Sequence, residues 1–239
     1  MAKDKLKRWA ENKTFDHVFE PNLLPIIKEG KTFMKGEWRS KFFKNDHPLV
    51  IELGCGKGEY TVQLAEANPD INYLGIDVKG HRFNHGARIA KAKGLKNVAF
   101  LRTRIEFIEA FFDTNEVDEI WLTFSDPQPK DDIGLKRITS VFFWKKYASF
   151  LKENGIIHIK HDNPMMYESA MEELDNTPFI IQSHSNDVYG HYIKGLDAKW
   201  RSILSIRTYY ESRWLEEGKK IHYVRFKTRH LQRWVNSMV

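Results

Sequence analysis

The 239-residue sequence predicts an α/β fold, in which helices cover both faces of a mostly parallel seven-stranded sheet. Two observations predict this class. From residue 48 onward, short apolar segments alternate with amphipathic helical segments, at the spacing of parallel strands joined by crossover helices. The first apolar segment also runs directly into a glycine-rich turn that opens a helix. Ligands of such folds bind beyond the carboxyl ends of the strands, so the residues found there are the candidates for function.

The predicted strands are apolar, β-branched runs bounded by Gly, Pro, Asn or Asp. They cover residues 48–53, 71–76, 98–101, 117–124, 155–160, 179–184 and 223–226. The predicted helices carry apolar residues at three- and four-residue spacing. They cover residues 59–67, 80–93, 105–112, 138–151 and 164–174. Residues 1–47 contain several Pro and Gly residues, which predict a basic N-terminal arm with short helical pieces at 24–28 and 36–43. Residues 48–239 are predicted to form one main domain.

The chain is basic, with 38 Lys and Arg against 32 Asp and Glu and a formal net charge of +6. The basic residues are clustered: the stretch 78–105 holds Lys79, Arg82, Arg88, Lys91, Lys93, Lys96, Arg102 and Arg104 and no acidic residue. Both termini are also basic, and aromatic residues are interleaved with the charges near the C-terminus. Such surfaces suit RNA, because cations meet phosphates and rings stack on bases. An ordinary solvated surface is the alternative interpretation.

Cysteine content and the first residues bear on location. Cys55 is the only cysteine, so no intramolecular disulfide is possible, and a reducing cytoplasm fits. The charged segment that begins the sequence is not followed by the apolar stretch of a signal peptide, and no apolar run is long enough for a bilayer. No pair of His or Cys residues has the spacing of a zinc site, so no metal is expected.

The first glycine-rich turn predicts the binding site of a small cofactor. Glu52 comes two positions before Gly54-Cys55-Gly56-Lys57-Gly58, and Asp77 ends the next strand. The Gly-x-Gly-x-Gly spacing differs from the Gly-x-Gly-x-x-Gly of dinucleotide sites. A carboxylate there would repel a pyrophosphate but would attract the cationic amino acid end of S-adenosylmethionine. Asp77 is placed to accept hydrogen bonds from ribose hydroxyls. A plain turn is the alternative for the loop alone, and Cys55 is interpreted as a small residue rather than a nucleophile.

The chain resembles the bacterial tRNA (guanine-N7)-methyltransferases over roughly residues 49–223. The motifs that carry the resemblance stand in the order of that family: Glu52-Leu53-Gly54-Cys55-Gly56-Lys57-Gly58, Gly75-Ile76-Asp77-Val78, Phe124-Ser125-Asp126-Pro127-Gln128-Pro129-Lys130, His158-Ile159-Lys160-His161-Asp162-Asn163 and Thr208-Tyr209-Tyr210-Glu211. The Asp126 motif is much more specific than the glycine loop. The chain departs from the family in having Gln128 between the prolines, in the acidic pair Asp131-Asp132, and in Arg104, which replaces an Asp or Asn near the adenine.

The resemblance implies a Rossmann-like class I methyltransferase domain over 48–239, which transfers methyl from S-adenosylmethionine to N7 of guanosine 46 in the variable loop of tRNA and forms 7-methylguanosine. It implies that Asp126 is catalytic. The implied donor-binding residues are Glu52, Gly54, Gly56, Asp77, Arg104 and Asp126. The implied guanosine contacts are Lys130, Asp162, Thr208, Tyr209, Tyr210 and Glu211, and the implied RNA contacts are Lys136 and Arg137. The expected partner is tRNA, with no metal and no membrane, for a cytoplasmic monomer or weak homodimer.

Three other functions remain open at this stage. Exocyclic amino methyltransferases also place a proline-rich motif after the fourth strand, but theirs has two adjacent prolines followed by an aromatic ring, unlike Pro127-Gln128-Pro129. A small-molecule methyltransferase would not need the basic clusters. A non-catalytic RNA-binding module would not need Glu52, Asp77 and Asp126 together, and binding of the donor would discriminate it.

Overall fold

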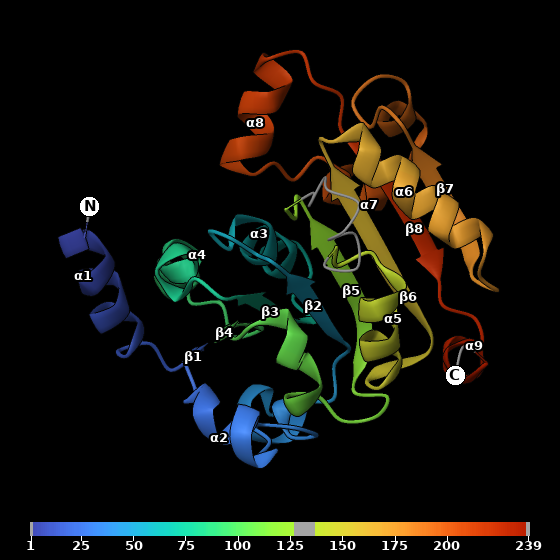
Figure 1. The fold of residues 1–239 in the computed structure, drawn as a ribbon. Helices are drawn as coiled ribbons and strands as arrows, with labels where there is room; N and C mark the ends of the chain where they lie inside the picture. The colour runs from blue at the N-terminus through green and yellow to red at the C-terminus, as the bar shows by residue number, and fades with distance from the viewer. Residues whose placement is uncertain (1, 127–136, 238–239) are drawn as a thin grey trace. The chain divides into compact units, whose positions relative to one another are not determined.

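The computed structural model of the protein describes residues 2–126 and 137–237 (Figure 1). The chain forms two compact units, Met1–Asp113 and Thr114–Val239. The described residues contain eight strands, the seven predicted ones and the additional strand β1 (Val18–Phe19), and crossover helices join successive parallel strands within the units. The predicted α/β class is therefore confirmed, with one strand more than expected.

In the first unit, four parallel strands lie in the order β1-β4-β3-β2. Their bounds are β2 Leu49–Leu53, β3 Asn72–Asp77 and β4 Val98–Arg102. Helix α3 (Glu59–Ala67) joins β2 to β3, and α4 (Gly80–Ala92) joins β3 to β4. β2 and β3 are buried along their whole length, which explains why their sequences are almost continuously apolar.

Glycine allows the turn after β2 to approach α4 closely. Gly58 has a φ of +73°, and a Cβ atom built on it would lie 2.5 Å from the ring of Phe100. Gly86 of α4 faces this turn, and its N–H donates to the carbonyl of Lys57 at 2.9 Å. A side chain at either glycine would push α4 away from β4, so the two glycines fix how the turn packs on the sheet.

The N-terminal arm contains more regular structure than the sequence predicted. Helix α1 (Ala2–Asn12) was not expected, and it packs against α4 (Figure 1). The buried side chain of Asn84 donates to Asn12 Oδ1 at 3.0 Å, and Arg88 pairs with Glu11. The two short helical pieces are confirmed as α2 (Leu23–Glu29) and a single π-helical turn (Trp38–Phe43). The functional division at residue 47 stays a prediction.

In the second unit, four strands lie in the order β5-β6-β8-β7. Strand β5 (Val117–Thr123) pairs in parallel with β6 (Leu151–His161), whereas β8 (His222–Lys227) and β7 (Ile180–Ser185) add antiparallel. Helices α5 (Val141–Ala148) and α6 (Pro164–Asp175) pack against β6 (Figure 1). The short helices α7 (Ala198–Leu204), α8 (Tyr209–Glu216) and α9 (Leu231–Asn236), and a 3₁₀ turn at Tyr192–Gly195, were not predicted.

Two predicted boundaries in this unit were wrong. The helix predicted over 138–151 is α5, which begins only after Ser140, and the strand predicted from residue 155 begins at Leu151. The early start of β6 reflects an irregularity in its pairing with β5, in which Leu151 pairs with Val117 and Ile156 with Glu119. Among the described residues no helix combines the length and the apolar character that crossing a bilayer requires.

Candidate functional site

The carboxyl end of β2 presents a buried acid followed by an open glycine turn. The Glu52 side chain is only 4% exposed, and its Oε2 accepts a hydrogen bond from the hydroxyl of Thr61 on α3. Gly54 has a φ of +79°, and a Cβ atom built there would have no neighbour within 4 Å in the described part of the chain. The turn therefore leaves space directly above the end of β2, with a carboxylate at its base.

Asp77 fixes the second side of this turn. Its Oδ2 accepts from the backbone N–H of Gly56 at 2.9 Å, and its Oδ1 accepts from the N–H of Lys79 at 2.7 Å. The backbone N–H groups of Gly54 and Cys55 both donate to the carbonyl of Ile76. Two acids and a glycine backbone are thus held rigidly at the ends of neighbouring parallel strands. A carboxylate has about four acceptor positions, so Asp77 can still accept from hydroxyl groups of a ligand.

These residues suit S-adenosylmethionine chemically. A buried carboxylate favours a cationic ligand, a second carboxylate can bind ribose hydroxyls, and the glycine turn provides room for the amino acid end. Burial and the nearby charges of Asp77 and Glu52 raise the pKa of the Cys55 thiol well above its usual range. Cys55 is therefore a thiol rather than a nucleophilic thiolate, which agrees with its interpretation as a small turn residue.

Arg104 follows the end of β4, as predicted, but its side chain is engaged locally. Its guanidinium pairs with Glu106 at 2.8 Å and lies over the ring of Phe107, and both charged side chains are about half exposed. The hydrogen bond and charge of Glu106 raise the pKa of Arg104. Any contact with an adenine would therefore compete with this pair. No cluster of three or more His, Cys, Asp or Glu side chains in the described part of the chain is arranged to hold a metal ion.

In the second unit, the chain turns sharply where β5 ends. Phe124 has a φ of +48°, in the left-handed region, which costs a non-glycine residue roughly 1–2 kcal/mol. Its ring packs against Trp214 of α8, with ring centroids 5.2 Å apart. Strained residues of this kind concentrate at functional sites, where the surrounding structure holds them. The turn leads directly to Ser125 and the exposed Asp126.

His161, at the end of β6, holds the backbone next to Asp126. Its Nδ1 accepts from the N–H of Asn163 at 2.9 Å, so its Nε2 carries the proton and donates to the carbonyl of Ser125 at 2.6 Å. Burial lowers the pKa of His161, although the Ser125 carbonyl and Asp162 oppose this. The ring is therefore neutral at pH 7, the only form that can make both hydrogen bonds.

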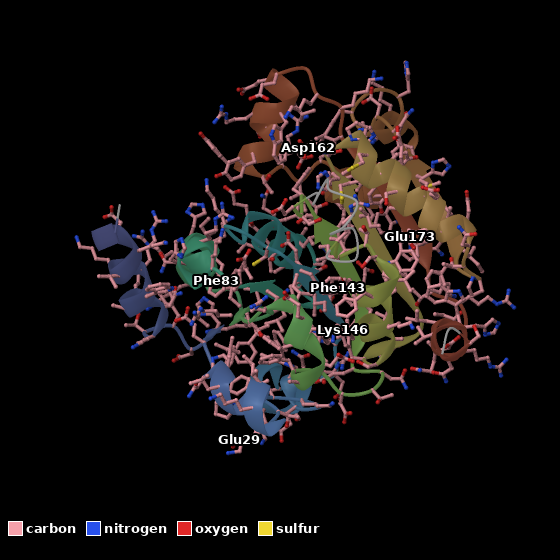
Figure 2. The ribbon with its side chains drawn as sticks, in the orientation of Figure 1. Glu29, Phe83, Phe143, Lys146, Asp162 and Glu173 are labelled. Carbon is pink, nitrogen blue, oxygen red and sulfur yellow. The ribbon has the colours of Figure 1, made fainter. Side chains whose placement is uncertain are left out.

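Asp162 borders a hollow of about 440 Å³ that is also lined by Lys219, Lys220 and His222. Figure 2 labels this side chain near the start of α6. Its Oδ2 lies 3.6 Å from Lys219 Nζ, and the side chain is 13% exposed. An acid just before a helix can serve as its N-cap, and Asp162 stands next to the start of α6. Instead, the neighbouring Asn163 caps α6, because its side chain accepts from the N–H of Met165.

The Thr208–Glu211 segment opens helix α8. Thr208 caps the helix by accepting from the N–H of Glu211 at 3.1 Å, and Tyr209 and Tyr210 are exposed. The Glu211 side chain is fully buried, and its Oε1 lies 2.8 Å from Nζ of Lys160, which is also fully buried. Burial lowers the pKa of Lys160, and the charge of Glu211 opposes that shift. The pair anchors α8 to β6.

The other predicted contacts fall in or beside residues 127–136. Lys130 and Lys136 lie outside the described residues. The half-buried Arg137 directs its guanidinium toward α6, where it lies 3.5 Å from Ser169 Oγ.

Comparison with known proteins gives the family. A family model described as "Putative methyltransferase" matches residues 46–224. The chain is 45% identical over 226 residues to the tRNA (guanine-N(7)-)-methyltransferase of Christiangramia forsetii, covering 95% of this chain and 98% of that protein. The chain belongs to the tRNA (guanine-N(7)-)-methyltransferase family.

Solved methyltransferase structures share the fold of this family member at low sequence identity. The 16S rRNA methyltransferase KamB is 14% identical, with a TM-score of 0.59 over 83% of this chain and 95% of that one. The 16S rRNA (adenine(1408)-N(1))-methyltransferase of Catenulisporales acidiphilia, solved with its cosubstrate SAM, is 13% identical, with a TM-score of 0.51 over 83% of this chain and 93% of that one. The predicted Rossmann-like class is thereby confirmed.

Sequence reasoning missed three residues that support the site of this methyltransferase. Thr61 orients Glu52, His161 holds Ser125, and Lys160 neutralises Glu211. Lys160 and His161 gave a usable signal, because charged residues at the end of an apolar strand are rarely left without partners in a protein interior.

Proposed function

We propose that this protein transfers the methyl group of S-adenosylmethionine to N7 of a guanine in tRNA, at position 46 in the variable loop. The observation that carries the proposal is the acid–glycine–acid arrangement of Glu52, the turn at Gly54–Gly56 and Asp77, found in a chain that matches tRNA (guanine-N(7)-)-methyltransferases over nearly its whole length. The family names support guanine N7 and tRNA. Position 46 rests on the resemblance alone.

The donor pocket is assigned to the first unit. Glu52 would attract the cationic amino acid end of the donor, the glycine turn at Gly54 and Gly56 would give that end room, and Asp77 would accept from the ribose hydroxyls. S-adenosylmethionine, when bound, supplies an electrophilic methyl group on a positively charged sulfur. Arg104 is retained as a donor-site residue only through its backbone, because its side chain is paired with Glu106.

The acceptor needs little chemistry from the protein. Guanine N7 carries a lone pair in the ring plane and no proton, so no strong base is required before attack. The protein has to orient the guanine and stabilise the positive charge that the base gains. Asp126 would do both by accepting from the N1 and N2 hydrogens of guanine, and we propose it as the catalytic residue.

The remaining assignments concern guanosine and RNA. Asp162 would contact guanosine from beside its hollow, together with Lys130 and the Thr208–Glu211 segment. Within that segment, Tyr209 and Tyr210 expose part of their rings and would stack on a base, while Glu211 offers one buried oxygen, Oε2, for which residues 2–126 and 137–237 provide no hydrogen-bond partner. Lys136 and Arg137 would bind RNA phosphates. We propose tRNA as the partner of a cytoplasmic protein, a monomer or weak homodimer.

The experiment is single-turnover methylation of unmodified tRNA with saturating, labelled donor, followed by nucleoside analysis and mapping of the modified position. The expected product is 7-methylguanosine at position 46, and a transcript with adenosine at that position should not be labelled. Methyl on another atom of guanine would reject the proposed chemistry, and 7-methylguanosine at another position would reject only the proposed site.

A further inference from the structure

A second hollow lies in the first unit, at the amino ends of the strands. It measures about 540 Å³, and it is lined by residues 14–17, 42–44 and 94–96 and by Lys91 and Val98. Lys44 precedes β2, and Lys96 precedes β4, whereas the glycine turn follows the other end of β2. Five residues of extended chain span ~17 Å, so the hollow is separated from the donor turn by about that distance.

The hollow carries an excess of positive charge. Lys44, Lys91 and Lys96 border it, against the single acid Asp16, which leaves a difference of two positive charges (3 − 1). His17, inside the hollow, has a lowered pKa. Burial is the main cause, and Lys91 and Lys96 act in the same direction, against the Ala87 carbonyl and Asp16.

These three lysines differ from their neighbours in sequence. Lys41 pairs with Glu37 at 2.7 Å, and Lys93 pairs with Glu66. No carboxylate among residues 2–126 and 137–237 lies within ion-pairing distance of Lys44, Lys91 or Lys96. Lys44, Lys91 and Lys96 can therefore bind an anion from outside, whereas carboxylates of the protein already neutralise Lys41 and Lys93.

The base of the hollow is aromatic. Phe15 and Phe43 are buried, Phe42 is half-buried, and the ammonium group of Lys91 lies 5.0 Å from the centre of the Phe15 ring. At Gly94, which has a φ of +65°, a Cβ atom would meet none of the described residues within 4 Å, so they leave the rim open there. Cationic groups around an apolar base suit a phosphodiester chain, because the ammonium groups meet phosphates while sugars and bases contact the rings.

We propose that this hollow binds a phosphodiester segment of the tRNA, away from the methyl-accepting guanine. The proposal rests on the proposed function, because tRNA is the polyanion that function requires. A short free polyphosphate would use the same phosphate chemistry, but a hollow with its cations at the rim and aromatic rings at its base fits a chain of spaced phosphates better. The contact is a binding contact, so it should contribute affinity for RNA and leave donor affinity unchanged.

The test compares two triple variants of the full chain. Lys44→Gln/Lys91→Gln/Lys96→Gln removes the charges of the hollow. Lys31→Gln/Lys41→Gln/Lys93→Gln removes three lysines that pair with Glu29, Glu37 and Glu66, and it changes net charge equally. The affinity for tRNA is measured at several salt concentrations. Each lost phosphate contact makes the negative slope of log K against log salt shallower by about 0.7–0.9. The slope of the hollow variant should therefore be shallower by roughly 2–3 than that of the wild type. The control should lose less than about 1.

Equal slopes for the two triple variants would overturn the proposal. It would also be overturned if inorganic triphosphate bound the wild type in a manner dependent on these lysines while the slope for tRNA stayed unchanged. All six lysines are exposed at the surface, and circular dichroism checks that both variants fold. Lys96→Gln alone, with an expected loss of about 0.7–0.9, serves if the triple variant does not fold. Wild-type methylation separates the two proposals: a wild type without 7-methylguanosine rejects the proposed function, whereas normal methylation with an unchanged slope rejects only the hollow.

Discussion

Removing either partner of the buried Lys160–Glu211 pair should strongly destabilise the second unit. Both side chains are fully buried, and their charged atoms lie 2.8 Å apart. Lys160→Met leaves the Glu211 carboxylate with the hydroxyl of Tyr189, at 2.8 Å, as its one side-chain hydrogen-bond donor among the described residues. Glu211→Leu leaves the Lys160 ammonium with the carbonyls of Leu204 and Ile206, at 3.1 and 2.9 Å, and with the hydroxyl of Tyr189 at 3.4 Å. An unpaired buried charge of this kind typically costs about 3–5 kcal/mol.

The loss of stability has an upper limit, because a buried group that lacks its partner can become neutral by gaining or losing a proton. At pH 7, protonating a glutamate of ordinary pKa costs about 3.7 kcal/mol, and deprotonating an ordinary lysine costs about 4.6 kcal/mol. We therefore expect a loss of about 3–4 kcal/mol for Lys160→Met and about 3–4.5 kcal/mol for Glu211→Leu. The double variant should cost clearly less than the sum, because no buried charge remains.

The assay is urea denaturation followed by circular dichroism and tryptophan fluorescence, with Glu217→Leu as the control. Glu217 lies just beyond the end of α8 and pairs with Arg213 at 3.8 Å, with both side chains about half exposed. Its loss should change the free energy of unfolding by less than about 0.5 kcal/mol. Single variants that lose less than about 1 kcal/mol, or a double variant whose cost equals the sum, would refute the reasoning. Methylation by the double variant is measured as well. If Glu211 contacts guanosine, methylation should stay low in the double variant even though the variant is more stable than the sum of the single losses predicts. If methylation is restored together with stability, that contact is rejected.

Three further predictions concern the two candidate sites. Glu52→Gln should weaken donor binding about 10- to 100-fold in calorimetry, because one buried charged partner is lost; tRNA affinity should not change, and Glu66→Gln at the exposed end of α3 is the control. Asp126→Asn should lower single-turnover methylation about 10²–10³-fold with donor affinity largely kept; near wild-type turnover would reject its catalytic role. The lowered pKa of His161 means that the unfolded chain protonates first, so the contribution of its neutral ring to stability is complete above about pH 6.5 and is lost as pH falls through the folded-state pKa. Methylation should therefore decline only as pH falls through the folded-state pKa, which lies below 6.5. An unchanged decline at acid pH in His161→Gln, whose side chain does not titrate, would contradict this origin.

Much of the fold could be predicted because its strands are buried and its helices are amphipathic. Helix α3 was predicted with its bounds, since the glycine turn begins it and Asn68-Pro69 ends it. Helix α1 was missed because Pro and Gly further along residues 1–47 were taken to break the whole segment, although residues 2–12 contain neither. The start of β6 at Leu151 depends on a pairing irregularity with β5, which no local pattern encodes.

The candidate site was predictable only in part, because its contacts, like the start of β6, depend on the pairing of strands. The rule that ligands bind at the carboxyl ends of parallel strands predicted Glu52, Asp77, Asp126 and Asp162 as candidates, and their roles stay predictions. What these residues touch depends on which strands are neighbours. The hydrogen bond from His161 to Ser125 exists because β5 and β6 pair in parallel, with Thr123 opposite Lys160, and that register could not be derived from either strand alone.

The end of β6 explains how two segments distant in sequence are held in one unit. Successive side chains of a strand point to opposite faces, so Lys160 and His161 serve different neighbours. Lys160 anchors the start of α8 through Glu211, and His161 fixes the turn after β5 through Ser125. The pairing of Lys160 with Thr123 on one side and with Tyr223 of β8 on the other sets which residue faces which neighbour. A slip of one residue would exchange the two faces, burying the imidazole against Glu211 and withdrawing support from Ser125. Strand β6, which was predicted as an apolar strand over 155–160, is therefore also the element that positions Asp126 and the Thr208–Glu211 segment.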